Sequence, residues 1–179
     1  MSRIADELYF APNIRFADLD LSGVYLPSQF QCRIDGFYLK PAIDLARSNH
    51  AFAAGVLVVC AIDALALLTT GSSSVTGRIK SFCKQIPELD SDEAAKIFCE
   101  SFRNGLVHQS RIKNGSEFSV DIDRIAICNN DRLVIHPLLL AQAVSRLLAE
   151  YVSSLYKNRR AQRTFRNKLK REFQFELHN

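Results

Sequence analysis

The sequence predicts a mostly α-helical fold with one small β-hairpin inserted before the last long helix. Residues 51–70 are almost uninterruptedly apolar, and residues 91–108 and 137–155 carry apolar side chains at intervals of three and four, which is the period of a helix with one buried face. Only residues 117–135 show the two-residue alternation that is typical of strands.

The length and composition indicate one packed soluble domain. The chain has 179 residues, and domains usually contain about 100 to 200. Apolar residues make up 47% and charged residues 23%, with 7 Gly and 5 Pro, which excludes disordered, collagen-like and low-complexity classes. Along the chain we expect an irregular or partly stranded N-terminal region (residues 1–36), a helical domain (37–156) and a basic helical extension (157–179).

The first two helices of the helical domain have recognisable limits. Residues 37–50 suit a helix if Pro41 lies in its first turn, where the missing N–H does no harm. A second helix runs over residues 51–70, and the glycine and serines of residues 71–74 end it as a loop.

The middle of the domain holds two shorter helices. Residues 75–86 form a short helix that Pro87 stops. Ser91 is an N-cap for the next helix, and Asp92 and Glu93 suit its positive start. We expect that helix to end near His108.

The strands and the last helix follow. Residues 117–123 alternate apolar and polar side chains, and after the apolar residues 125–127 the turn of residues 129–131 leads into residues 133–135. We read these residues as a small hairpin. Pro137 then starts a long helix whose apolar face continues to Leu155. We expect this helix to run on into the basic extension.

Residues 51–68 are long and apolar enough to suggest a membrane span. They are Ala-rich, carry the carboxylate of Asp63 near the middle and lack basic and aromatic anchors on both sides, all of which are unfavourable in a bilayer. A central helix of a helical domain explains the segment better, so no membrane association is expected.

The cysteines indicate a reduced protein without a metal site. They are five in number, scattered, and without a Cys-x-x-Cys pair or a histidine at zinc-finger spacing. Cys60, Cys83 and Cys99 lie in apolar or helix-like stretches, so we expect them to be core thiols in a reducing cytoplasm, with no metal or cofactor. The first residues carry acids and no long apolar region, unlike a secretory signal. The cysteines are Cys32, Cys60, Cys83, Cys99 and Cys128.

The charge is concentrated at one end of the chain. Residues 157–171 hold eight basic and no acidic side chains, whereas the remaining residues carry 15 basic and 19 acidic ones. Such a segment attracts phosphate backbones without reading sequence; the alternative is a solvated helix end. The eight candidate RNA-binding residues are Lys157, Arg159, Arg160, Arg163, Arg166, Lys168, Lys170 and Arg171.

The most distinctive short sequence is Phe-Arg-Asn-Gly-Leu-Val-His-Gln at residues 102–109, which places Arg103 five positions before His108. An imidazole can take or give a proton near neutral pH, and a guanidinium can hold two oxygens of a phosphate. On an ideal helix the two residues stand about 140° apart. They converge if the helix loosens at Gly105, if the arginine bends round, or if two protomers combine their pairs.

The run from Arg103 to His108, with Asn104 directly after the arginine, resembles the Arg-polar-x-x-x-His signature of the HEPN superfamily, the higher eukaryote and prokaryote nucleotide-binding helical domains. A long alanine-rich helix, a helix that ends in the motif, a two-stranded excursion and a closing helix are also similar to the later parts of several bacterial members. The resemblance covers about residues 37–156 and implies a HEPN-like helical bundle.

Many HEPN proteins are metal-independent endoribonucleases, dimers whose composite active site uses both protomers' motifs. The resemblance implies that His108 acts on the ribose 2′-hydroxyl or the leaving oxygen and leaves a 2′,3′-cyclic phosphate. It also implies that Arg103 stabilises the charged phosphorane and that Asn104 orients one of these two side chains, His108 or Arg103. One subgroup has a modifiable tyrosine where this chain has Ser110, which argues against that modification here.

The same resemblance implies the biological setting. Bacterial members often act as toxins or in phage defence, so we expect a cytoplasmic homodimer that cleaves RNA, with an antitoxin or inhibitor protein as a further partner. Two other functions remain open. The chain could be a non-catalytic HEPN-like module that binds nucleic acid or a partner protein through its basic end, or a purely structural helical dimer.

Asp63 is an acid within an apolar helix, and a buried carboxylate must be paired or hydrogen-bonded. Arg78 and Arg103 are its candidate partners. The simpler interpretation is a structural cap or ion pair, and the functional one is a tether for the catalytic arginine. If the chain is an enzyme, Arg103 and His108 should approach each other in an open basic cleft, within or across protomers.

Overall fold

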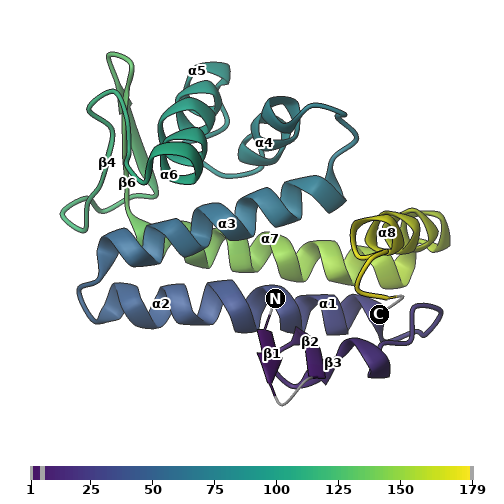
Figure 1. Ribbon diagram of the computed structural model, residues 1–179. Coiled ribbons are helices and arrows are strands. Elements are labelled where there is room, and N and C mark those ends of the chain that lie inside the picture. Colours follow the sequence, from purple (N-terminus) through teal and green to yellow (C-terminus); the bar gives the residue numbers. More distant parts are fainter. Residues whose placement is uncertain (1, 5–6, 178–179) are drawn as a thin grey trace. The chain divides into compact units, whose positions relative to one another are not determined.

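The computed structural model describes residues 2–4 and 7–177 of the chain, and residues 1, 5–6 and 178–179 lie outside the described part (Figure 1). The fold is mostly α-helical with few, short strands, as the sequence predicts. The chain forms two compact units. The terminal unit combines Met1–Phe37 with Leu148–Asn179, and the central unit is Tyr38–Leu147.

The terminal unit begins with three short antiparallel strands in the order β1-β2-β3. They confirm the expected partly stranded region, but the helix α1 that follows was not expected. Pro27 lies in the first turn of α1, where proline starts a helix rather than stopping it. The elements are β1 (Ser2–Ile4), β2 (Glu7–Ala11), β3 (Ile14–Arg15), the 3-10 helix η1 (Phe16–Asp18) and α1 (Leu26–Ile34).

An arginine surrounded by phenylalanines lies in the core of the terminal unit. Arg33 of α1 is 9% exposed, and one of its guanidinium nitrogens donates to the carbonyl oxygen of Phe10. The guanidinium carbon also lies 4.8 Å from the ring centroid of Phe173 and 5.5 Å from that of Phe37. Cation–π contacts of this kind compensate part of the cost of burying the charge.

The basic extension forms a separate helix, which corrects the expectation that the last long helix runs into it. The helix α7 (Pro137–Lys157) ends before Asn158, whose backbone is extended with φ −131° and ψ 100°. The side chain of Asn158 accepts a hydrogen bond from Ala161 N at 3.0 Å and so caps α8 (Arg159–Glu172). Asparagine prefers such a cap position to a helix interior, which explains the break.

The helix α8 is amphipathic within its own unit. Phe165 and Leu169 are buried, and the ring centroid of Phe165 lies 5.4 Å from that of Phe30 on α1. The ring centroid of Tyr151 on α7 lies 6.1 Å from that of Phe165. Most of the basic side chains of α8 are exposed, whereas Arg166 and Lys168 are half-buried.

The central unit contains the remaining helices and a second sheet. Pro41 is the second residue of α2, which follows the π-helical turn η2 and α1 without a break in the helical backbone. In Figure 1, α3 lies between α2 and α4, and it packs against both. The elements are η2 (Asp35–Leu39), α2 (Lys40–Arg47), α3 (Ala51–Thr69), α4 (Val75–Cys83), α5 (Asp92–Ile97), the π-helical η3 (Phe98–Arg103) and α6 (Asn104–Gln109).

The helix α3 is the core helix of the central unit. It is long and apolar enough to cross a bilayer, but Val58, Ile62 and Leu65 are at most 1% exposed inside the protein. Half of its most apolar 18-residue window is buried in this way (50%), which is typical of a helix that packs on both sides. The arrangement is consistent with a soluble protein.

The second sheet has the order β4-β6-β5 and contains the predicted hairpin. The strands β5 (Ala126–Asn129) and β6 (Arg132–Ile135) are antiparallel, and Asn130 and Asp131 turn between them with positive φ. The strand expected over residues 117–123 is reduced to β4 (Glu117–Phe118). Beyond it, Ser119 Oγ accepts a hydrogen bond from Asp121 N at 3.1 Å, and this local turn replaces the strand pairing.

Phe118 anchors β4 to two helices of the central unit. Its ring centroid lies 5.0 Å from that of Phe102 in η3. A Cβ atom on Gly55 of α3 would lie 2.3 Å from the Phe118 ring, so only glycine admits the ring at that place. The loop between α6 and β4 is therefore held at its far end.

The buried cysteines Cys83 and Cys99 should react more slowly with thiol reagents than the exposed Cys32. Cys83 and Cys99 are 0% exposed, and burial raises the pKa of both thiols, whereas Cys32 is exposed. Since the thiolate is the reactive form, we expect Cys32 to react rapidly with a disulfide reagent at pH 8 and Cys83 and Cys99 to react only after unfolding. Mass spectrometry of peptides labelled with and without urea tests this; rapid labelling of Cys83 in the native protein would contradict the described core.

Candidate functional site

The predicted motif lies on one long helical stretch in which a π-helical turn is embedded. The stretch consists of α5, η3 and α6 in direct succession, and Ser91 Oγ caps its start by accepting from Ala94 N at 3.0 Å, as predicted. It ends at Gln109, close to the expected His108, because Ser110 adopts the left-handed conformation with φ 53°. The helix limits were therefore predicted correctly from the sequence, and the π-helical turn was not.

The π-helical turn ends at Arg103. Within it, the N–H of Asn104 donates to the carbonyl oxygen of Cys99, five residues earlier, and such turns occur often at functional sites. The rings of Phe98 and Phe102 stack at 5.8 Å in the core. Arg103 follows directly and lies at the edge of that core, with 16% of its side chain exposed.

Arg103 forms an ion pair with Asp63. Of the two arginines that the sequence offered as partners of Asp63, Arg103 is therefore the one that pairs with it. The Nε and Nη2 atoms of Arg103 donate to the same carboxylate oxygen, Oδ2, at 3.1 and 3.0 Å. The Asp63 side chain is 32% exposed. The two residues are 40 positions apart, and their contact joins the middle of α3 to the end of η3.

Arg78, the other candidate partner, makes a different contact. Its Nη1 donates to the carbonyl oxygen of Ser73 at 3.0 Å, and its buried Nε has no hydrogen-bond partner in the described part of the chain. Arg78 therefore binds the loop before α4 and does not pair with Asp63. This corrects the expectation that Arg78 supports the site by binding the Asp63 carboxylate.

The side chain of Asn104 binds the guanidinium of Arg103, its neighbour in the sequence. Arg103 Nη1 donates to Asn104 Oδ1 at 3.1 Å. A guanidinium has five N–H donors, so the bonds to Asp63 and Asn104 leave two donors for a ligand. The arginine is thus oriented by protein contacts on both sides before any ligand binds.

His108 lies four residues after Asn104 on α6 and is exposed. Side chains at this spacing are neighbours on one helix face. Within the described residues, the imidazole makes no hydrogen bond or ion pair, with Arg103 or with any other residue. The helix is regular through Gly105, and in the single chain the Arg103 guanidinium is hydrogen-bonded to Asp63 and Asn104 rather than to His108.

The basic residues of the predicted RNA-binding segment are not equivalent. Arg166 is half-buried, and its Nη2 donates to the carbonyl oxygen of Ser22 at 3.1 Å. Arg166 therefore connects α8 to the loop before α1, and Lys168 is also half-buried and engaged. The remaining six basic side chains are exposed: Lys157, Arg159, Arg160, Arg163, Lys170 and Arg171.

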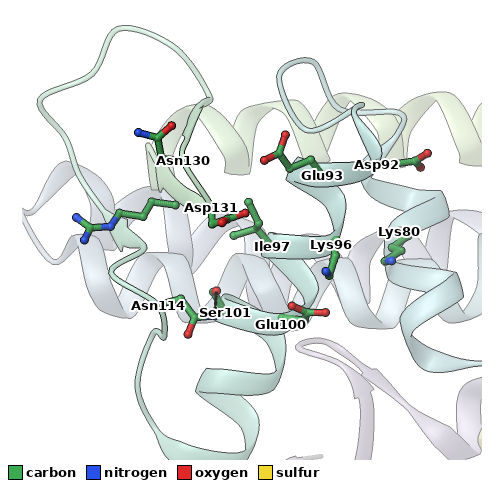
Figure 2. A pocket seen from close by; sticks show the side chains of 11 residues that line it. Lys80, Asp92, Glu93, Lys96, Ile97, Glu100, Ser101, Asn114, Asn130 and Asp131 are labelled. Carbon is green, nitrogen blue, oxygen red and sulfur yellow. Dashed lines mark hydrogen bonds between the residues drawn. The ribbon is translucent and has the colours of Figure 1, made fainter.

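A pocket of about 650 Å³ lies beside α5 and η3, next to the turn of the β5–β6 hairpin (Figure 2). Its lining does not include Arg103, Asn104 or His108. Four carboxylates and three cations line it, an acidic balance that disfavours phosphate. Among the described residues, no group of His, Cys, Asp or Glu could hold a metal ion. The charged lining residues are Asp92, Glu93, Glu100, Asp131, Lys80, Lys96 and Arg132.

Chemically, the motif combines a tethered guanidinium with an exposed imidazole on the same helix end. The first can bind an anion through its two remaining donors, and an imidazole is a side chain that can serve as a general acid or base. No family model, curated protein or solved structure matches the chain.

The contact between Asp63 and Arg103 should be measurable as a coupling energy. Its burial lies between that of exposed pairs and fully buried ones, so we expect Asp63→Asn and Arg103→Met each to lower the free energy of unfolding by about 1 to 3 kcal/mol. The double variant should lose about 1 kcal/mol less than the sum of the single losses. Urea denaturation of the four proteins gives the coupling.

The exposed pair of Lys84 and Asp92, whose side chains are 49% and 88% exposed, is a matched control. Its coupling energy should be below about 0.5 kcal/mol. Equal couplings for both pairs would show that the tether on Arg103 is no stronger than a surface contact.

Proposed function

We propose that this chain is a metal-independent endoribonuclease of the HEPN type, with Arg103, Asn104 and His108 as its active groups. The observation that carries the proposal is the hydrogen-bonded chain from Asp63 through Arg103 to Asn104. It orients a guanidinium towards the helix face on which the exposed His108 stands, one turn later. Orientation before binding is what electrostatic stabilisation of a transition state requires.

The reaction is a transfer within the RNA strand. His108 accepts the proton of a ribose 2′-hydroxyl while the 2′-oxygen attacks the adjacent phosphorus, or it donates a proton to the 5′-oxygen as that oxygen leaves. The bond from phosphorus to the 5′-oxygen breaks, and the products are a 2′,3′-cyclic phosphate and a 5′-hydroxyl. The two remaining donors of Arg103 bind the phosphate oxygens on which charge accumulates. Asn104 acts by orienting Arg103.

One imidazole cannot be base and acid in the same step. The resemblance to HEPN ribonucleases supplies the second group, because in that family two copies of the chain combine their motifs. We therefore include a homodimer in the proposal, in the cytoplasm, with a role as a toxin that an antitoxin or inhibitor protein restrains, or in phage defence. The exposed cations of α8 would attract the RNA strand.

A second candidate is a non-catalytic HEPN-like module that binds nucleic acid or a partner protein. It is favoured by the low exposure of the Arg103 side chain, 16%, and by the absence of a hydrogen bond between Arg103 and His108 in the described chain. Such a module would use the exposed basic face of α8 for binding and the ion pair of Asp63 and Arg103 for stability alone.

Cleavage of mixed RNA in excess EDTA separates these two functions. We expect the protein to cleave and to leave cyclic phosphate ends, and we expect His108→Ala and Arg103→Ala to lower the rate by at least about 100-fold, because each removes a group that acts in the transition state. His50→Ala replaces another exposed histidine of the central unit, outside the motif, and should retain the full rate.

Three outcomes would count against the nuclease. Equal cleavage by the protein and by His108→Ala would identify a contaminant or another site, and cleavage only with added metal would exclude the proposed mechanism. RNA that stays intact while still binding in a salt-dependent way would favour the non-catalytic module.

The proposed role of α8 gives a separate prediction for RNA affinity. Replacing Arg159, Arg163 and Lys170 by Gln together should reduce the slope of the logarithm of the affinity against the logarithm of the salt concentration by about 2, since each phosphate contact on a single strand contributes about 0.7. Arg166→Gln should lower the melting temperature instead and leave the slope unchanged, because Arg166 contacts Ser22. Fluorescence anisotropy of a labelled RNA measures the slopes, and an unchanged slope in the triple variant would exclude α8 as an RNA contact.

A further inference from the structure

The segment after the motif folds back onto the motif helix. This post-motif loop, residues 110–116, begins with the left-handed Ser110, and the N–H of Arg111 donates to the carbonyl oxygen of Gly105 at 3.3 Å. A Cβ atom on Gly105 would lie 2.4 Å from the carbonyl oxygen of Arg111, a distance that no side chain tolerates. The glycine inside the motif is therefore required by the close approach of the loop.

The post-motif loop is also held further along. The N–H of Lys113 donates to the carbonyl oxygen of Ser101 at 3.2 Å, and Asn114 Nδ2 donates to Ser101 Oγ at 3.3 Å; Figure 2 shows these two side chains side by side. Ser116 Oγ accepts a hydrogen bond from Leu133 N at 3.1 Å. The loop is thus positioned by protein contacts alone, without a ligand.

These contacts bring Lys113 to the face of the helix that carries His108. The Cγ atom of Lys113 lies 3.2 Å from the place of a Cβ atom on Gly105, so the aliphatic part of the lysine passes over the glycine. Gly105 and His108 are three residues apart on α6 and are therefore neighbours on one face. In the described part of the chain, the Lys113 ammonium makes no hydrogen bond or ion pair.

Two cations beside the motif lack a carboxylate partner in the described part of the chain. Residues 101–116 contain Arg103, which Asp63 pairs, together with Arg111 and Lys113, and the acidic residues nearest to them in the sequence are Glu100 and Glu117. Arg111 is exposed, and its Nε donates to Gln109 Oε1 at 3.2 Å, which leaves other donors of its guanidinium for a ligand. Two cations beside an exposed imidazole suit the repeated negative charges of a nucleic acid backbone.

The geometry points to a second phosphate subsite on the post-motif loop, in which Lys113, assisted by Arg111, binds the RNA phosphate next to the one that is cleaved. This inference rests on the proposed function, because it assumes that the scissile phosphate lies at Arg103 and His108. Lys113 and Arg111 act as positioning residues. They bind the strand beside the reacting phosphate equally in the substrate and in the transition state, and they take no part in proton transfer.

Binding of a labelled single-stranded RNA to the His108→Ala protein tests the subsite without cleavage. In that background, Lys113→Gln should weaken binding about 5- to 10-fold and reduce the salt slope by about 0.7, as expected for one lost phosphate contact. Lys113→Arg keeps the charge and should restore most of the affinity. Lys96→Gln is the matched control, since it removes one charge from an exposed lysine of the same helical stretch that lines the acidic pocket.

Cleavage by the protein with His108 intact gives the second readout. Lys113→Gln should raise KM about 5- to 10-fold and change kcat less than about twofold, because a contact away from the reacting atoms contributes equally to substrate and transition state. Gly105→Ala should displace the whole loop and raise KM at least as much. Circular dichroism of each variant shows whether the fold is retained, and Lys113→Gln, at a half-exposed loop position, leaves the helix contacts of the backbone intact.

The outcomes separate the subsite from the proposed function. If His108→Ala abolishes cleavage while Lys113→Gln binds RNA no more weakly than Lys96→Gln, the subsite is wrong and the nuclease stands. If the protein never cleaves but Lys113→Gln still weakens binding and Lys113→Arg restores it, the subsite stands as part of a non-catalytic RNA-binding surface. Loss of affinity to the same degree in Lys113→Arg would also overturn the subsite, because the charge would then not be the cause.

Discussion

The ion pair of Asp63 and Arg103 is the contact on which the site depends. A carboxylate in the middle of an apolar helix needs a partner, because an unpaired charge at such a place is expensive. The partner comes from the end of a π-helical turn, at N···O distances of 3.0 and 3.1 Å. The pair therefore joins α3 to the motif helix and, through Asn104, fixes where the guanidinium points.

Two glycines make the close packing around this pair feasible. Gly55 lets the Phe118 ring approach α3, and Gly105 lets the carbonyl oxygen of Arg111 approach α6. Together they hold both ends of the chain segment between α6 and β4. A loop fixed in this way loses little conformational entropy when it binds a ligand, which is the condition for a preorganised site.

The charges along the motif helix are divided between its two ends. The early part, α5 and η3, contributes Glu93 and Glu100 to an acid-rich pocket, and the late part continues into the basic post-motif loop. If the chain acts on RNA as proposed, the first end would attract the strand less than the second. On the proposed function, this polarity would favour a bound strand beside His108, even without contacts to its bases.

The sequence by itself determined the helical class, the cap at Ser91, the place of Pro41, the β5–β6 hairpin and the spacing of Arg103 and His108, since these depend on residues within about one turn of each other. Local patterns could not decide which arginine pairs with Asp63, that Asn158 separates α7 from α8, or that Arg166 binds Ser22. The π-helical turn before Arg103 and the return of the post-motif loop to Gly105 are likewise absent from any short pattern. Partners that are tens of residues apart are selected by packing and by the need to pair buried polar groups, and only the tertiary structure decides them.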